Sequence, residues 1–200
     1  MSANQTALIL DGSLTSGCVA LLTVSGSETG TLKVAEVGAP PRGHLERAAS
    51  LLPTATSRAG LVAVVIGVGP GSYTGIRAAS AAAAGIAAAL NLPIVQIESD
   101  RALLYAASER EDETVAIPLG TREMLLIRKG GSEILPQGEA RASADLGRVA
   151  ERLPQAFANL AASALRDVLS ATSRGEVVQN RAITLRYPSP PRGVEGRGGR

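Results

Sequence analysis

The chain has 200 residues, of which 45% are apolar and 19% are charged, so it can bury a sizeable core in one large domain or two small ones. Three Tyr, one Phe and no Trp are its aromatic residues, and this scarcity argues against single-stranded nucleic-acid binding on stacked aromatic rings. The net charge of +2 comes from residues 187–200, so the rest of the chain is nearly neutral and attracts RNA or DNA only weakly by itself.

The N-terminus and the cysteine content predict a cytoplasmic protein. The first residues, MSANQT, lack a basic segment followed by an apolar one. The uncharged run 78–90 is too short and too small in side-chain volume to span a membrane. Cys18 is the single cysteine, which excludes a disulfide within the chain and fits a reducing compartment. Its apolar neighbours favour a small buried hydrophobic residue over a reactive thiol.

The first hundred residues predict the order βββαβαβ. Three strands form an antiparallel meander that starts at the N-terminus. A helix follows, which Pro53 should kink or break and Gly60 should end. A strand with apolar residues throughout, as expected when both faces are buried, leads to a helix that begins near Thr74. The strands are expected at 6–11, 17–24, 31–37, 61–68 and 92–98, and the first helix at 44–60.

The second half is shorter and less regular. A helix is expected over 99–112, with Ser99 or Asp100 as its cap. The remaining expected elements are a hairpin of strands 113–118 and 122–129, a helix over 155–174 closed by Gly175, and a strand-like segment at 181–188. The chain should therefore form two α/β lobes. The expected domains are an N-terminal lobe 1–99, a C-terminal lobe 100–187 and a disordered tail rich in Pro, Gly and Arg at 188–200.

The glycine-rich turn between the apolar strand and its helix, GPGSYTGIR over residues 69–77, matches none of three common enzyme motifs. A P-loop needs GxxxxGK[ST], but here five residues, not four, separate Gly69 from Gly75, and Ile76 follows Gly75 in place of the Lys. The GxGxxG fingerprint of dinucleotide-binding proteins is also absent, and so is the GxSxG motif of a nucleophile elbow. Two interpretations stay open: an anion held at the helix N-terminus, with Gly71 and Ser72 as weak candidates, or a tight connection in which glycines permit close packing.

Two further sites come from polar residues near the N-terminus. Asp11 and Ser13 lie at the end of the first strand and could help to cradle a phosphate, although a hairpin turn is the more common use of such a stretch. His44 is the only histidine, so two-histidine metal sites are excluded. With Glu46 it could form a weak catalytic pair, but a solvated first helical turn is the favoured interpretation.

Four segments together resemble the TsaB (YeaZ) family. They are the nonamer at 69–77, ILDGS at 9–13, HLER with LLP over 44–53, and ITLRYP at 183–188. Members of that family are non-catalytic, dimerising subunits of the bacterial machinery that places threonylcarbamoyl on N6 of a tRNA adenosine. The sequence departs from the family pattern in the second lobe, where 118–125 keeps only Glu123 of an otherwise characteristic strand.

The resemblance implies an α/β fold of the actin-like ATPase (sugar kinase/Hsp70/actin, ASKHA) class, in two lobes with a short second lobe. It also implies pairing with a TsaD-type catalytic subunit, further contact with a TsaE-type ATPase, and a homodimer. Contact with tRNA is expected only through the complex, and no membrane association is expected. It implies no cofactor, no metal and no catalytic residue.

The helix after the glycine-rich turn suggests where a partner would dock. At 100° per residue, one stripe should face the sheet, and the opposite side carries only small uncharged residues. The stripe is Ile76, Ala79, Ala83, Ile86 and Leu90. A helix that is apolar all round is expected to be covered all round, either by the chain's own 43–58 helix or by that helix together with a partner's. The expected interface residues are His44, Arg47, Leu51, Thr74, Arg77, Ala78, Ala81, Gly85 and Ala88.

Two enzyme alternatives compete with the scaffold. One is an actin-fold, ATP-dependent small-molecule phosphotransferase that uses Asp11 with Mg²⁺. The hairpin 113–128 offers it neither a Gly-Gly phosphate turn nor an Asp. The other is a glycoprotease-like (M22) peptidase, for which the sequence supplies neither a metal site nor a triad.

Overall fold

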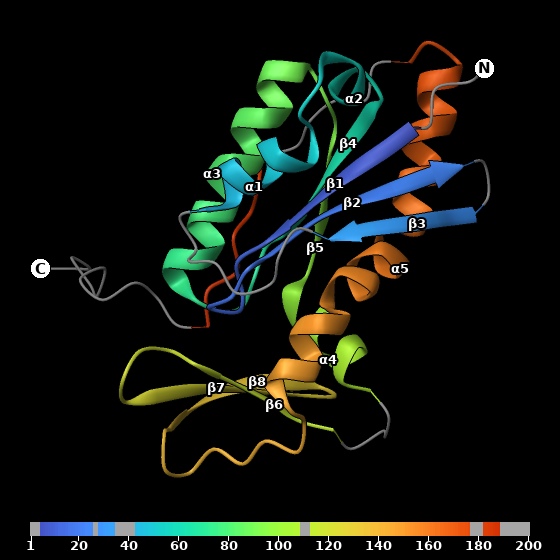
Figure 1. Ribbon diagram of the computed structural model, residues 1–200. Helices are drawn as coiled ribbons and strands as arrows, with labels where there is room; N and C mark the ends of the chain where they lie inside the picture. The colour runs from blue at the N-terminus through green and yellow to red at the C-terminus, as the bar shows by residue number, and fades with distance from the viewer. Residues whose placement is uncertain (1–4, 26–27, 35–42, 109–112, 177–181, 189–200) are drawn as a thin grey trace, which may run out of the picture.

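A five-stranded sheet forms the larger part of the molecule (Figure 1). The computed structural model describes residues 5–25, 28–34, 43–108, 113–176 and 182–188. The sheet has the order β3-β2-β1-β4-β5. Its strands are β1 (Gln5–Asp11), β2 (Cys18–Ser25), β3 (Glu28–Val34), β4 (Leu61–Gly67) and β5 (Ile94–Ile97). The meander predicted for the first three strands is confirmed, because β1 pairs antiparallel with β2 and β2 with β3.

Parallel pairing of β1, β4 and β5 places their carboxyl ends at one edge of the sheet. Such pairs need crossover connections, which helices α1 (His44–Leu51), α2 (Ala55–Ala59) and α3 (Tyr73–Leu90) provide. The predicted break at Pro53 is confirmed, since α1 ends just before it and Thr54 caps α2 through a capping box with Ser57.

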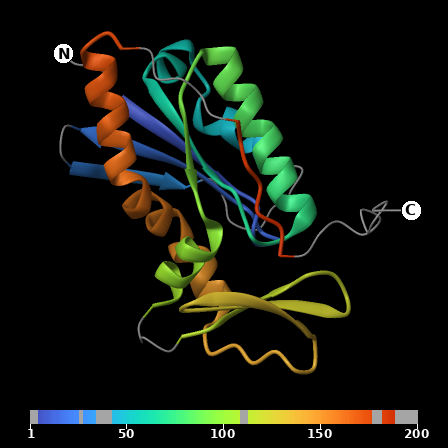
Figure 2. The ribbon, with the colours of Figure 1, turned by 180° about the vertical axis from the view of Figure 1, so that it is seen from behind.

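Both faces of this sheet are covered, which explains the uninterrupted apolar runs in β1 and β4. Alternate residues of β1 point to opposite faces. Ala7 and Ile9 belong to one apolar cluster, and Leu8 and Leu10 to another. The second cluster lies under α1 and α3, and the first under the long helix α5 (Leu146–Ser173) (Figures 1 and 2).

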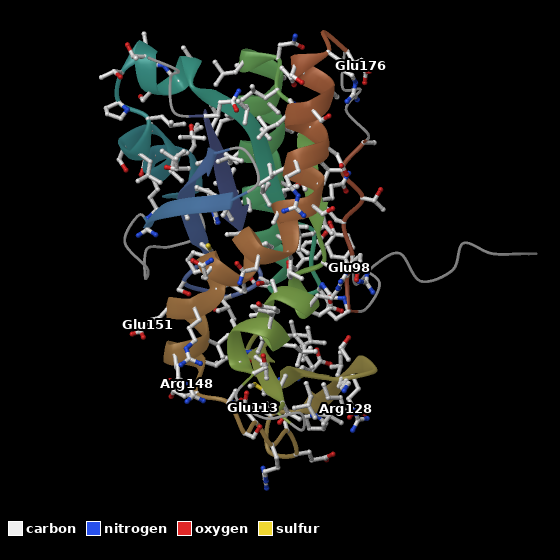
Figure 3. The ribbon with its side chains drawn as sticks, turned by 90° about the vertical axis from the view of Figure 1, so that its right-hand side faces the viewer. Glu98, Glu113, Arg128, Arg148, Glu151 and Glu176 are labelled. Carbon is white, nitrogen blue, oxygen red and sulfur yellow. The ribbon has the colours of Figure 1, made fainter. Side chains whose placement is uncertain are left out.

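A three-stranded antiparallel sheet follows α4 (Ser99–Ala107). Its strands are β6 (Val115–Pro118), β7 (Glu123–Arg128) and β8 (Gly131–Pro136), in that order. The predicted hairpin of β6 and β7 is confirmed, whereas β8 was not predicted. Arg148 near the start of α5 and Glu113 before β6, both labelled in Figure 3, form an ion pair at 3.5 Å. The apolar cluster under α5 continues through α4 into this second sheet, so the division at residues 99 and 100 stays a prediction.

Several predicted element ends differ from the observed ones. Helix α5 begins at Leu146, capped by Asp145, not at residue 155, and it ends before Gly175 as predicted. The prediction that Ser99 or Asp100 caps α4 is wrong: Glu98 is the N-cap residue, and it makes no capping bond through its side chain. Within 182–188 no strand is assigned. Of the predicted tail, Pro188 is described and 189–200 lie outside the described residues.

Membrane insertion is a separate question from the element ends. None of the helices in the described part of the chain has the length and apolarity to cross a membrane.

Candidate functional site

The carboxyl ends of β1, β4 and β5 hold a cluster of buried polar groups. Ligands of open α/β sheets bind at this edge. Asp11 ends β1, the glycine-rich turn follows β4, and Ser99 follows β5. Asp11, Ser13 and Ser99 are each 0% exposed, so the fold brings together polar residues that the sequence places far apart.

Asp11 is held by three hydrogen-bond donors. The Ser13 backbone N donates to Oδ2 at 2.9 Å, and the Ser13 hydroxyl donates to the same oxygen at 2.5 Å. The Ser99 hydroxyl donates to Oδ1 at 2.7 Å and accepts from Gly69 N at 3.0 Å. Both carboxyl oxygens are therefore bound within the chain. The carboxyl links the ends of β1 and β5, and the Ser99 hydroxyl extends the link to the turn after β4.

Burial raises the pKa of Asp11 above its ordinary value, because the charged form loses its hydration. The hydrogen bonds from Ser13 and Ser99 oppose this shift, since they favour the charged form. Burial also raises the pKa of the Cys18 thiol, and the nearby Asp11 charge adds to the shift. Cys18 is 4% exposed, which confirms the prediction of a small buried hydrophobic residue.

Glycines bring the two loops at this edge into backbone contact. A Cβ at Gly12 would lie 2.0 Å from the carbonyl oxygen of Gly75, and one at Gly71 would lie 2.5 Å from the Ser13 Cα. The Ser72 hydroxyl caps α3 by accepting from Gly75 N. The close-packing interpretation of the glycine-rich turn is therefore confirmed.

The four weak candidates for cofactor binding, Asp11, Ser13, Gly71 and Ser72, do come together. The structure uses all four within the protein itself, as carboxyl acceptor, donor, close-packed backbone and helix cap. Among the described residues there is no group of three His, Cys, Asp or Glu side chains that could hold a metal ion.

The favoured interpretation of His44 as a solvated residue is wrong. Its side chain is 4% exposed, and Nε2 lies 2.9 Å from the carbonyl oxygen of Asp11. A Cβ at Gly17 would approach Nε2 to 3.0 Å, so the ring packs against the β1–β2 turn. His44 therefore anchors α1 to the sheet, and its side chain contributes nothing to an exposed interface, contrary to expectation. Glu46, its proposed catalytic partner, is exposed.

The sheet-facing stripe of α3 is largely as predicted. Ile76, Ala79 and Ala83 are fully buried, and Ile86 is half-buried. Leu90, in the last turn, is instead 37% exposed. Ala48 and Leu52 beside α1 pack in the same cluster as this stripe, which covers one flank of α3.

The opposite face of α3 is largely exposed, and it has no charged residue from Ala78 onward. Thr74, Ala81, Gly85 and Ala88 are exposed, and Ala78 is half-buried. The alternative in which the chain's own helix covers this face alone is therefore wrong, because α1 reaches only its flank. The alternative that adds a partner's helix stays a prediction. Of the other expected interface residues, Arg77 of α3 is exposed, and Arg47 and Leu51 of α1 are half-buried.

Comparison with known sequences decides the family. A family profile described as "TsaD: tRNA N6-adenosine threonylcarbamoyltransferase" matches residues 39–172, which is more than half of the chain. The chain belongs to this family. The match begins before α1 and continues through most of α5, so it includes the glycine-rich turn and the exposed face of α3.

Within the TsaD family, the expected relationship to the TsaB/YeaZ proteins is confirmed. The "tRNA threonylcarbamoyladenosine biosynthesis protein TsaB" of Haemophilus influenzae is 31% identical over 125 residues, which cover 60% of this chain and 50% of the relative. The chain thus matches about half the length of that curated relative.

The family match and the solved structures together support the actin-like fold class. "YeaZ from Pseudomonas aeruginosa" aligns with a TM-score of 0.53 and 23% identity, covering 88% of this chain and 95% of that one. An uncharacterized protein "with similarity to peptidase YEAZ from Pseudomonas aeruginosa" has the same TM-score, 0.53, and 24% identity, covering 87% of this chain and 94% of the other. The mixed α/β class with two sheets is therefore confirmed.

Sequence reasoning missed the contacts of the C-terminal segment with this site. Arg186 forms an ion pair with Glu98 at 2.6 Å. The available signal was the alternation of Ile183, Leu185 and Tyr187 near the end of the chain. Periodicity alone does not say which strand such a segment lies beside.

Proposed function

We propose that the chain is a non-catalytic scaffold subunit in the synthesis of N6-threonylcarbamoyladenosine in tRNA, pairing with a TsaD-type catalytic subunit. Family membership and the similarity to a TsaB protein support the pathway. The same proposal includes a cytoplasmic location, contact with a TsaE-type ATPase and access to tRNA only through the complex. Self-association into a homodimer would use the same helix face in the absence of the catalytic subunit.

The exposed face of α3 is the observation that carries the proposal. A solvated helix face ordinarily has Lys or Glu, yet no charged residue occurs from Ala78 to Leu90. Ala81, Gly85 and Ala88 are exposed on this face. Small residues let a second helix approach closely, so that side-chain ridges of one helix fit grooves of the other. The face therefore suits a helix of a partner protein.

The buried polar cluster supports a structural role for the sheet edge. An actin-fold phosphotransferase would need Asp11 to face a nucleotide-bound metal ion, but this carboxyl is 0% exposed and is bound by Ser13 and Ser99. The single histidine of the sequence is bound to Asp11 O. These contacts favour the scaffold over both the phosphotransferase and the peptidase.

The substitution Ala81→Arg tests the docking face. Ala81 is exposed in the single chain, so the variant should keep its stability within about 0.5 kcal/mol, as surface substitutions usually do. Against a partner helix, the long charged side chain adds a clash and an unpaired charge. Affinity for the TsaD-type subunit should therefore fall at least about tenfold, which is about 1.4 kcal/mol.

Melting temperature and capture of the purified TsaD-type subunit are measured on the same preparations. The control Ala81→Ser stays small and should change neither quantity. A folded Ala81→Arg variant that pairs as well as the unaltered chain would show that this face does not dock the partner.

A further inference from the structure

Residues 182–188, here called the strap, lie along β5, the last strand of the five-stranded sheet (Figure 2). The Gln96 side chain of β5 holds the first part of the strap at two points. Its Nε2 donates to the Ala182 carbonyl at 3.0 Å, and its Oε1 accepts from Thr184 N at 3.0 Å. One side-chain amide thus supplies both bonds that a neighbouring strand would supply from its backbone.

The second part of the strap is anchored on the glycine-rich turn. Arg186 N donates to the Val68 carbonyl at 2.7 Å. A Cβ at Gly69 would come within 2.3 Å of the Arg186 carbonyl oxygen, so the absence of a side chain there makes room for the strap. The ring centroids of Tyr187 and Tyr73, the first residue of α3, lie 5.0 Å apart.

Side chains of the strap alternate between the body and the surface. Ile183 and Leu185 are half-buried and pack against the apolar cluster under α3. The Arg186 guanidinium lies 2.6 Å from Glu98 and 3.7 Å from Asp100. Figure 3 labels Glu98 close to the strap. The body of the protein therefore contacts a segment, 183–187, whose side chains are in order aliphatic, polar, aliphatic, Arg and aromatic.

Each of these contacts is individually weak. Arg186 and Glu98 are both nearly half exposed, and exposed ion pairs contribute little. Within the described residues, the strap makes one backbone-to-backbone hydrogen bond to the body, from Arg186 N to the Val68 carbonyl oxygen. Such a segment should detach without unfolding of the sheet beneath it.

We propose that the β5 edge, the Val68–Gly69 turn and Tyr73 form a peptide-binding groove, which the strap occupies reversibly. The mode is the addition of an extended segment to an open sheet edge. Because the strap is tethered, its effective concentration at the groove is of the order of millimolar. A free peptide of the same sequence must therefore compete with it, and weakening the strap should expose the groove.

The test uses the full-length chain and a fluorescein-labelled synthetic peptide, AITLRYP, which copies the strap. In one variant, Arg186→Ala and Tyr187→Ala together weaken the chain's own strap while leaving the groove unaltered. Fluorescence anisotropy should show saturable binding of the peptide to this variant. Its affinity for the unaltered chain should be at least about tenfold weaker, because the tethered strap competes.

Two matched controls locate the binding. Adding Gln96→Leu to the double variant removes both amide bonds and should weaken peptide binding at least about tenfold. A peptide with Ala in place of its Arg and Tyr should bind at least about tenfold more weakly to the double variant. No saturable binding to the double variant, or equal affinity for it and the unaltered chain, would overturn the proposal.

Hydrogen exchange of the unaltered full-length chain gives a second measurement that needs no substitution. The Thr184 and Arg186 amides should exchange at least about tenfold faster than the buried β4 amides, because strap opening precedes global unfolding. Equal protection of the strap and β4 would show that the strap opens only when the whole domain unfolds, and the groove would then not be a separable site.

Discussion

At the scale of single residues, Asp11 shows how a candidate for chemistry can be a structural residue. Its carboxyl accepts hydrogen bonds from Ser13 after β1 and from Ser99 after β5, and the Ser99 hydroxyl in turn accepts from Gly69 N after β4. A buried carboxyl with several donors is costly to disrupt, since each donor left behind has no water to bind.

Replacing Asp11 by Ala should therefore destabilise the fold. It removes the acceptor of the Ser13 N, Ser13 Oγ and Ser99 Oγ donors, and a buried donor without a partner costs about 1–3 kcal/mol. We expect a loss of at least about 2 kcal/mol in the free energy of unfolding, measured by urea denaturation. Asp11→Asn keeps the volume and one acceptor oxygen and should lose less. Equal stability of the Ala variant and the unaltered chain would contradict this role.

The pH dependence of the Asn variant tests the same carboxyl. Burial raises the pKa of Asp11 in the folded chain above its unfolded value, so the folded state holds this proton more tightly. Protonated Asp11 then makes its full contribution to the free energy of unfolding at pH values below the unfolded pKa of about 4. It is lost as pH rises through the raised folded pKa. Over that window the unaltered chain should lose stability relative to Asp11→Asn, and parallel pH profiles would refute the assignment.

At the scale of elements, α3 combines two different faces. The buried face packs on β1 and β4 through residues such as Ile76 and Ala79, while the exposed face is small and uncharged. Helix propensity and partner docking make opposite demands at a glycine on such a face, because glycine weakens a helix but permits close approach.

Gly85→Ala separates these two demands. No heavy atom lies within 4 Å of a Cβ built at Gly85, and the residue is exposed within α3. The substitution should raise the stability of the single chain by about 0.5–1 kcal/mol. Against a closely packed partner helix the added methyl should weaken pairing. Denaturation and partner titration of the same variant give both values.

The reverse substitution, Ala84→Gly, is the matched control on an adjacent exposed position of α3. It should lower stability by a similar amount and leave pairing unhindered. If Gly85→Ala stabilises the chain and pairing is unaffected, the partner helix does not cross at Gly85.

At the scale of the whole molecule, the segments after the second sheet return to the first. Helix α5 packs across the five-stranded sheet and also on α4, and the strap lies on the edge of β5 (Figure 2). The five-stranded sheet and the three-stranded sheet therefore share one continuous apolar cluster, which runs through α4 and α5.

Removing residues 189–200 should leave folding and pairing intact. The removed segment is rich in Pro, Gly and Arg and has few apolar residues, so it lacks material for a core. The strap, including the contact of Tyr187 with Tyr73, is retained. We expect an unchanged melting temperature and unchanged capture of the TsaD-type subunit. A large fall in melting temperature would show that these residues pack on the body, and a selective loss of tRNA association would reveal an electrostatic role.

Local patterns in the sequence were enough to predict the antiparallel meander, the buried strand β4, the helix after the glycine-rich turn and the break at Pro53. Apolar periodicity and helix-breaking residues act within a few positions along the chain, so they can be read without knowing the fold. The nonamer at 69–77, with the three shorter segments, likewise indicated the family before the fold was known.

Tertiary structure alone decided the roles of Ser99, His44 and Arg186. Ser99 bonds to Asp11 instead of capping α4, His44 is buried against the β1–β2 turn, and Arg186 closes the strap over the glycine-rich turn. Each role depends on a partner at least 33 positions away in the sequence. Such partners are chosen by the parallel pairing of β1, β4 and β5, which brings distant strand ends to one edge of the sheet.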